Sequence, residues 1–235
     1  MPPLTSSSIR IIPTIFATTL PEFRRRLHHL APNFNELQID IMDGRFVPAK
    51  SIDLSKIPNI SRVHARFEAH LMTENPTVMV PLLAKKGFVR VIAHIEALRN
   101  RERILAFLKA ASQAEMEAGL AINPNTRVQK VIPYLDQIRL VLFLGVYPGK
   151  EGQRFIPSVA KKIQRFKAFR TPAGRSVSRR DVWIQIDGGV NPESAACIAQ
   201  SGAHRFNTGS YAANAKDPKS AVRHLKQLIR KFALG

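Results

Sequence analysis

Short apolar segments rich in Val, Ile, Leu and Phe recur along the chain, and longer charged stretches with helical spacing separate them. Apolar runs of this length are typical of buried strands, whereas apolar residues three or four positions apart indicate amphipathic helices. The expected strands lie at about 9–16, 36–42, 63–69, 88–95, 118–122, 138–146, 182–186 and 203–207. The expected helices lie at about 20–31, 76–86, 100–117, 127–135, 156–169, 192–201 and 217–233. This alternation predicts an α/β protein with a parallel sheet.

The number of expected strands separates two α/β architectures, a closed (β/α)8 barrel of the TIM type and an open doubly wound sheet. Eight strands alternating with helices in 235 residues favour the barrel. The open sheet would place a glycine-rich phosphate turn after its first strand, but here that strand ends in Pro13-Thr14-Ile15-Phe16. No linker rich in Ser, Gly or Pro divides the chain, so we expect a flexible leader at residues 1–8 and one barrel domain at 9–235.

A barrel builds its ligand site from residues just past the carboxyl ends of many strands. Asp40 and Asp187 each follow an alternating apolar run, and two carboxylates at that edge indicate acid/base chemistry. Each aspartate could instead only cap a turn, because Asp-Gly pairs are common turn sequences. The other residues at expected strand exits are Thr14, Met42, His70, Met72, His94, Glu96, Asn123, residues 148–153, Gly188, Gly189 and Thr208-Gly209-Ser210.

The charge of the chain favours anionic partners. Lysine and arginine number 36 against 17 acidic residues, which gives a formal net charge of +19. The basic clusters at Arg24-Arg25-Arg26 and residues 170–180 would suit RNA, but they also fit a solvated helix face and a loop. Nucleic acid is therefore the less favoured partner, although the charge does not exclude it.

Cysteine usage and hydropathy indicate where the protein works. Cys197 is the single cysteine, so no intramolecular disulfide can form, as is usual in a reducing cytosol. No apolar run approaches the roughly 18 residues that a membrane span needs. Residues 1–8 lack the apolar core of a signal peptide. We expect a cytoplasmic protein with no membrane partner.

The motifs at the strand exits resemble those of the ribulose-phosphate 3-epimerase family, in unbroken order from about Ile11 to Ala212. That resemblance identifies the barrel as one of the ribulose-phosphate-binding type. The matching segments are Pro13-Thr14-Ile15, Asp40-Ile41-Met42-Asp43-Gly44, Phe46-Val47-Pro48, His70-Leu71-Met72, Glu74-Asn75-Pro76, His94-Ile95-Glu96-Ala97, Gly119-Leu120-Ala121-Ile122-Asn123-Pro124, Pro148-Gly149, Gly152-Gln153, Phe155, Asp187-Gly188-Gly189 and Gly209-Ser210.

The resemblance implies an isomerase of carbohydrate metabolism that interconverts D-ribulose 5-phosphate and D-xylulose 5-phosphate in the pentose phosphate pathway. In that family two aspartates transfer the C3 proton through an enediolate, and by position these are Asp40 and Asp187. Asp40, His70 and Asp187 match three of four ligands to one divalent metal ion, which could be Zn, Mn, Fe or Co. The implied substrate-binding residues are Thr14, Met42, His70, Met72, Gly149, Gly152, Gly188, Gly189, Gly209 and Ser210, the glycines letting backbone N–H groups approach a phosphate.

Three departures from the family pattern affect these expectations. Gln38 stands where the family has a histidine as its fourth metal ligand, so either the amide oxygen ligates hard ions or Gln38 does not ligate. Lys150-Glu151 replaces a Phe-Gly pair in the phosphate loop, where Lys150 could itself reach phosphate. Leu144 replaces one of three methionines over the sugar, with little change in volume.

Two classes of function remain open on the sequence. The favoured one is a metal-dependent epimerase of a ketose phosphate, either the pentulose or allulose 6-phosphate. The alternative is a catalytically weakened barrel that binds a phosphosugar or RNA, motivated by Gln38, Glu151 and the charge of +19. The sequence also leaves the oligomeric state open, a homo-oligomer included.

Overall fold

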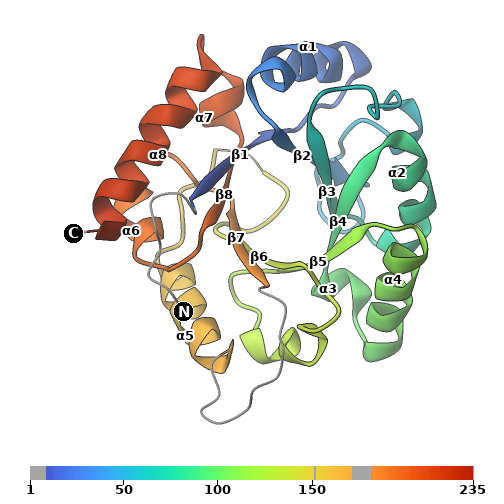
Figure 1. The fold of residues 1–235 in the computed structure, drawn as a ribbon. Helices are drawn as coiled ribbons and strands as arrows, with labels where there is room; N and C mark the ends of the chain where they lie inside the picture. Colours follow the sequence, from blue (N-terminus) through green and yellow to red (C-terminus); the bar gives the residue numbers. More distant parts are fainter. Residues whose placement is uncertain (1–8, 151, 171–181, 235) are drawn as a thin grey trace.

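The expected strands form a closed parallel barrel. The computed structural model describes residues 9–150, 152–170 and 182–234, so the expected leader at 1–8 and most of the basic segment at 170–180 lie outside the described residues. Neighbouring strands pair in sequence order and β8 returns to β1, which confirms the barrel and excludes the open sheet (Figure 1). The strands are β1 (Arg10–Ile15), β2 (Glu36–Met42), β3 (Arg66–Met72), β4 (Phe88–His94), β5 (Glu117–Ile122), β6 (Leu140–Leu144), β7 (Trp183–Asp187) and β8 (Arg205–Thr208).

Helices surround the ring of strands (Figure 1). Their ends follow local signals: Thr19 caps the first helix by accepting from the backbone N–H of Glu22, and Gly87 ends the second with a φ of 94°. The helices are α1 (Leu20–Leu30), α2 (Val80–Lys86), α3 (Ile95–Leu98), α4 (Arg101–Gln113), α5 (Ser158–Arg170), α6 (Ala195–Ala199), α7 (Ser210–Ala213) and α8 (Pro218–Leu234). Single 3₁₀ turns are η1 (Ala31–Asn33), η2 (Leu54–Lys56) and η3 (Pro76–Met79).

The prediction of a helix at 127–135 was wrong. This segment forms two 3₁₀ turns, η4 (Val128–Lys130) and η5 (Ile132–Tyr134). Pro133 has no backbone N–H to donate and its ring clashes with the preceding turn, so an α-helix cannot pass through it. The apolar residues that suggested a helix still pack against the barrel, Val128 and Val131 among them.

Two further boundaries differ from the sequence expectation. The third strand runs from Arg66 to Met72 instead of 63–69, because pairing with β2 begins only where Arg66 lies beside Glu36. Val63 packs against the core from the turn before the strand. The expected helix at 192–201 shortens to α6 because Asn191 and Ser194 hold the preceding turn by exchanging hydrogen bonds of 3.1 Å.

The inside of the barrel is divided into an apolar and a polar half. Apolar side chains from β4, β5 and β6 pack together as a cluster of their own, formed by Ile92, Ala121, Leu140, Leu142 and Leu144. Residues of β2, β3, β4, β7 and β8 form a buried ion layer, which we define as Gln38, Glu68, Arg90, Gln185 and Arg205. Charged groups are rarely buried unless they are paired, and here Arg90 Nη1 lies 2.6 Å from Glu68 Oε2.

Candidate active site

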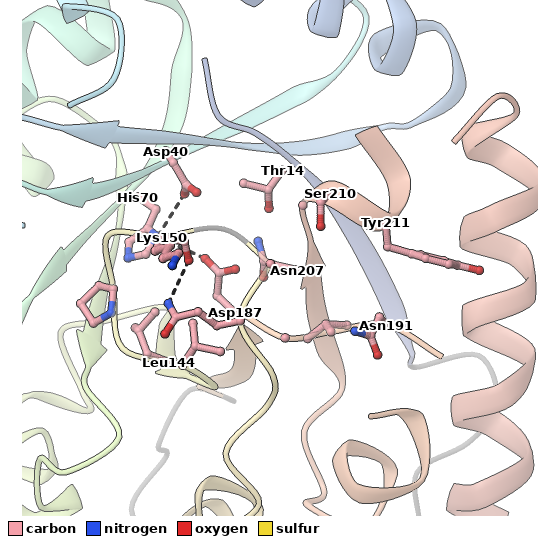
Figure 2. A pocket seen from close by; sticks show the side chains of 18 of the residues that line it. Thr14, Asp40, His70, Leu144, Lys150, Asp187, Asn191, Asn207, Ser210 and Tyr211 are labelled. Carbon is pink, nitrogen blue, oxygen red and sulfur yellow. Dashed lines mark hydrogen bonds and ion pairs between the residues drawn. The ribbon is translucent and has the colours of Figure 1, made fainter. Parts of the chain in front are cut away.

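The predicted site residues meet in one pocket of about 510 Å³ at the carboxyl end of the barrel. Figure 2 shows Asp40, His70 and Asp187 on one side of it, with Asn191, Ser210 and Tyr211 on the other. The residues predicted from sequence that line the pocket are Thr14, Asp40, Met42, His70, Met72, Gly149, Gly152, Asp187, Gly188, Gly189, Gly209 and Ser210. Of the residues at which this chain departs from the family pattern, Leu144 and Lys150 also line the pocket, whereas Gln38 does not.

Asp40 and Asp187 form a carboxylate pair held by one histidine. The strands β1 and β8 separate β2 from β7, so the two carboxylates enter the pocket from different parts of the ring. His70 Nδ1 lies 3.1 Å from Asp40 Oδ1 and 3.2 Å from Asp187 Oδ2. Because an ionised carboxylate only accepts hydrogen bonds, Nδ1 is the donor to both.

The carboxylate pair controls the charge of His70. Burial alone would lower its pKa, but hydrogen bonds and attraction from Asp187 and Asp40 outweigh that effect and raise the pKa to about 9. On its other side, His70 Nε2 lies 2.9 Å from His94 Nε2, and the rings stack at 5.0 Å. Burial lowers the pKa of His94, which favours its neutral form. His94 Nε2 can then accept a hydrogen bond from the N–H group at His70 Nε2.

Gln38 joins the carboxylate pair from below, two residues before Asp40 on β2. Its Nε2 donates to Asp40 Oδ1 at 2.9 Å and to Asp187 Oδ2 at 2.7 Å. Its Oε1 accepts from Asn207 Nδ2 at 2.8 Å. The same two carboxylate oxygens therefore receive N–H groups from both His70 and Gln38, which fixes the orientation of both aspartates.

An apolar wall and a glycine rim complete the pocket. Met42, Val47 and Met72 form a small buried cluster, and Met42 and Met72 line the pocket. At the rim, Gly189 has a φ of 70° and its backbone touches the loop after β6. A Cβ there would lie 2.6 Å from the backbone nitrogen of Phe155, so only glycine lets the two segments meet.

We expect Gly189→Ala to be more destabilising than Gly152→Ala. The glycines share a positive φ, 70° and 74°, but a Cβ at Gly152 meets nothing within 4 Å. Left-handed strain alone costs about 1 to 3 kcal/mol, and the backbone clash at Gly189 adds about 1 to 3 kcal/mol more. Urea unfolding of both variants measures the difference. Equal losses would show that the contact with Phe155 is not tight.

Comparisons with known proteins agree with this geometry. The Ribulose-phosphate 3 epimerase family matches residues 10–212. Ribulose-phosphate 3-epimerase from Bacillus subtilis is 34% identical over 191 residues, covering 81% of this chain and 85% of that protein. Ribulose-phosphate 3-epimerase 1 from Cupriavidus necator is 31% identical over 228 residues, covering 96% and 93%. The chain belongs to the ribulose-phosphate 3-epimerase family. Membership places it among the isomerases.

Solved structures support the fold of this family member. The 3-hexulose-6-phosphate synthase of Salmonella typhimurium aligns with a TM-score of 0.68 at 15% identity, covering 95% of this chain and 100% of that one. The 3-keto-L-gulonate-6-phosphate decarboxylase of Vibrio cholerae aligns with a TM-score of 0.67 at 14% identity, covering 95% and 98%. At such low identity the likeness establishes the barrel architecture alone.

Three side chains of this epimerase-family chain fit a divalent metal ion. Asp40, His70 and Asp187 each offer one ligand atom, and these atoms lie within 4.8 Å of one another. Two carboxylate oxygens and one imidazole nitrogen suit Zn, Mn, Fe or Co. The fourth family position does not fit, because imidazole nitrogen at His70 can release its proton to bind a metal, whereas the amide nitrogen that Gln38 turns toward the carboxylates cannot.

Several neighbours of the site were missed by sequence reasoning. Asn207, Asn191, Tyr211 and Asn214 line the pocket, and none was predicted. Asn207 lies on β8, two residues before the predicted site residue Gly209, so the period of two along a strand could have placed its side chain inward.

Three residues predicted at strand exits, His94, Glu96 and Asn123, do not line the pocket. They are buried or partly buried outside its lining, and Glu96 accepts from the backbone N–H of Asn123 at 2.9 Å.

Proposed function

We propose that this chain catalyses the 3-epimerisation of a ketose phosphate, D-ribulose 5-phosphate to D-xylulose 5-phosphate. The observation that carries the proposal is the carboxylate pair, Asp40 and Asp187, held by His70 at one end of a pocket whose other end is rimmed by glycines and Ser210. Inversion at a carbon beside a ketone requires proton removal on one face and delivery on the other, and two separate carboxyl groups can divide that work.

The proton balance of the reaction requires that one of the two aspartates is ionised while the other is protonated. One carboxylate takes the C3 proton, so the C–H bond breaks and its electrons form the enediolate. The other group, which enters as the acid, gives its proton to the opposite face of C3. The pair thus carries one proton in all, and its two members exchange roles in the reverse reaction. A divalent ion held by Asp40, His70 and Asp187 would stabilise the negative charge that develops on the substrate oxygens.

The remaining lining residues can position the sugar phosphate. Thr14 Oγ1 and Asn207 Oδ1 are buried in the pocket wall and have no hydrogen-bond partner among the described residues, so both suit sugar hydroxyls. Gly188, Gly189 and Gly209 suit the phosphate, since no side chain screens their backbone. Lys150, the one lysine or arginine lining the described pocket, supplies a positive charge nearby.

The test is a coupled assay on the full-length protein, stripped with a chelator and reloaded with Mn²⁺, Co²⁺, Fe²⁺ or Zn²⁺ in turn. We expect turnover of ribulose 5-phosphate with at least one metal and loss of about 10²-fold or more without any. Allulose 6-phosphate serves as the competing substrate, and faster turnover of it would reassign the sugar. No turnover of either sugar with any metal would contradict the proposal and favour the phosphosugar- or RNA-binding alternative.

We also propose that the net charge of +19 acts on encounter with the anionic sugar. Added salt should therefore lower kcat/KM while kcat changes little, because screening weakens long-range attraction over about 10 Å at 0.1 M salt. Initial rates in increasing sodium chloride measure this, since sulfate or phosphate would compete for the site. A kcat/KM that is independent of salt would assign the charge to another partner, with RNA first to be examined.

A cytoplasmic location is part of the proposal. The single cysteine and a sugar phosphate substrate both suit that compartment. The helices within the described residues include none long and apolar enough to cross a membrane.

A further inference from the structure

The amide of Gln38 occupies the position of a metal ligand but faces the site with its nitrogen. That nitrogen lies 2.9 Å from Asp40 Oδ1 and 2.7 Å from Asp187 Oδ2, and the side chain is fully buried. Turning the amide over would place Oε1 at these distances from two carboxylate oxygens. Three acceptors would then meet without a proton between them, at a buried position where such repulsion is strong.

The far end of the amide is fixed independently by Asn207. Its Nδ2 donates to Gln38 Oε1 at 2.8 Å and to Glu68 Oε1 at 3.2 Å. Glu68 is anionic beside Arg90 and can only accept, so the nitrogen of Asn207 must point toward it. A nitrogen on Asn207 in turn requires an oxygen on Gln38. Asn207 Nδ2 therefore donates in both directions, up to Gln38 and down to Glu68, and Gln38 has a single orientation in which its nitrogen faces the carboxylate pair.

Two other members of the buried ion layer, Gln185 and Arg205, hold Glu68 from below. Arg205 Nε donates to Gln185 Oε1 at 2.8 Å, and Gln185 Nε2 donates to Glu68 Oε1. Arginine is always a donor, so Gln185 too has a single allowed orientation. Gln38 is thus oriented from below by Arg and Glu, which cannot exchange donor for acceptor, and from above by the two aspartate oxygens that also lie against His70 Nδ1.

We propose that Gln38 is a positioning residue, a bridging N–H donor to Asp40 and Asp187, and that a metal ion at this site has three protein ligands. Asn207 and Glu68 impose this orientation on the amide. The positioning role of Gln38 rests on the proposed function, because that function gives the carboxylate pair its task. The number of protein ligands to the metal does not rest on it. Gln38 acts on the substrate only through the two aspartates, since it does not line the pocket.

Metal affinity tests the coordination without any assay of turnover. Titration calorimetry with Co²⁺ alone is performed on chelator-stripped protein, as wild type, Gln38→Leu and Gln38→His. Gln38 orients two metal ligands without being one, so Gln38→Leu should weaken Co²⁺ binding by no more than the roughly 10- to 100-fold typical of a neighbouring group. Gln38→His adds an imidazole and should bind about 10- to 100-fold more tightly. A loss beyond about 100-fold, or a visible absorption spectrum of bound Co²⁺ that differs between Gln38→Leu and wild type, would show that the amide oxygen is a ligand and overturn the proposal.

A second variant leaves Gln38 in place, in case leucine at this position prevents folding. Asn207→Leu removes the donor that holds Gln38 Oε1, so the amide becomes free to turn its oxygen to the metal. We expect Co²⁺ to bind about threefold or more tightly to Asn207→Leu, at the scale of neighbouring-group effects on metal sites. Adding Gln38→Leu should cancel the gain. An unchanged affinity in Asn207→Leu, or a gain that survives in the double variant, would overturn the imposed orientation.

Steady-state kinetics separate a positioning role from general loss of structure. Gln38→Leu should lower kcat by about tenfold or more while KM stays within about threefold, because the aspartates lose orientation but the substrate loses no contact. A kcat equal to that of wild type would overturn the positioning role. If wild type itself fails to epimerise ketose phosphates, the proposed function fails, but the affinity series still decides whether Gln38 ligates.

Discussion

Asp40→Asn and Asp187→Asn should each lower kcat by about 10² to 10⁴-fold, the range typical of losing a general acid or base. An amide cannot take up or deliver the C3 proton, so neither substitution leaves a complete path across the sugar. Each variant also removes a carboxylate that His70 and Gln38 hold in place. The effect should be similar in both directions of the reaction, because the two aspartates exchange roles.

The measurement is the coupled assay, with bound metal quantified in every variant. Asp136→Asn, at an exposed position outside the pocket lining, serves as the matched control and should retain wild-type turnover. The proton-transfer role is contradicted if either active-site variant, with metal shown to be bound, turns over at the wild-type rate.

Glu68→Gln should lower the free energy of unfolding by about 3 to 5 kcal/mol, the cost of breaking a buried ion pair from one side. Glu68 and Arg90 are almost fully buried and lie 2.6 Å apart. The substitution leaves Arg90 with only the more exposed carboxylates of Glu36 and Glu117 as counter-charges. It also places an NH2 group where Gln185 and Asn207 already present donors, so at least one N–H loses its acceptor.

Urea unfolding gives the loss directly, and Glu74→Gln is the matched control. Glu74 pairs with Arg99 at 3.2 Å, but both side chains are exposed, and such pairs contribute about 0 to 1 kcal/mol. The two variants therefore change the same residue type in an ion pair and differ in burial. Losses of equal size would contradict the structural importance of the buried ion layer.

The sequence predicted the barrel and the carboxylate pair because both depend on local patterns. Alternating apolar runs identified every strand, and the carboxyl ends of the strands meet at one end of a closed barrel, where the pocket lies. This is why Asp40, His70 and Asp187 could be expected together. The helix at 127–135 failed for an equally local reason, since one proline outweighs a favourable apolar spacing.

The ion layer and the orientation of Gln38 could not be predicted in the same way. Gln185 and Glu68 are 117 positions apart in the sequence and do not lie on paired strands, so only closure of the ring brings them into contact. Asn207 is 169 positions from Gln38. A pattern read along one strand shows that a polar residue points inward. It does not show which end of an amide faces which partner, because that depends on the whole hydrogen-bonded chain.

The central claim is that the carboxylate pair exchanges the proton at C3, and proton NMR in D₂O tests it most directly. Metal-loaded protein is incubated with ribulose 5-phosphate, and the sugars are followed over time. We predict xylulose 5-phosphate that carries one deuterium at C3 and none at its other carbons, formed about 10² to 10⁴-fold more slowly by Asp40→Asn and by Asp187→Asn. Xylulose 5-phosphate formed with hydrogen retained at C3, or formed equally fast by both variants, would contradict the account.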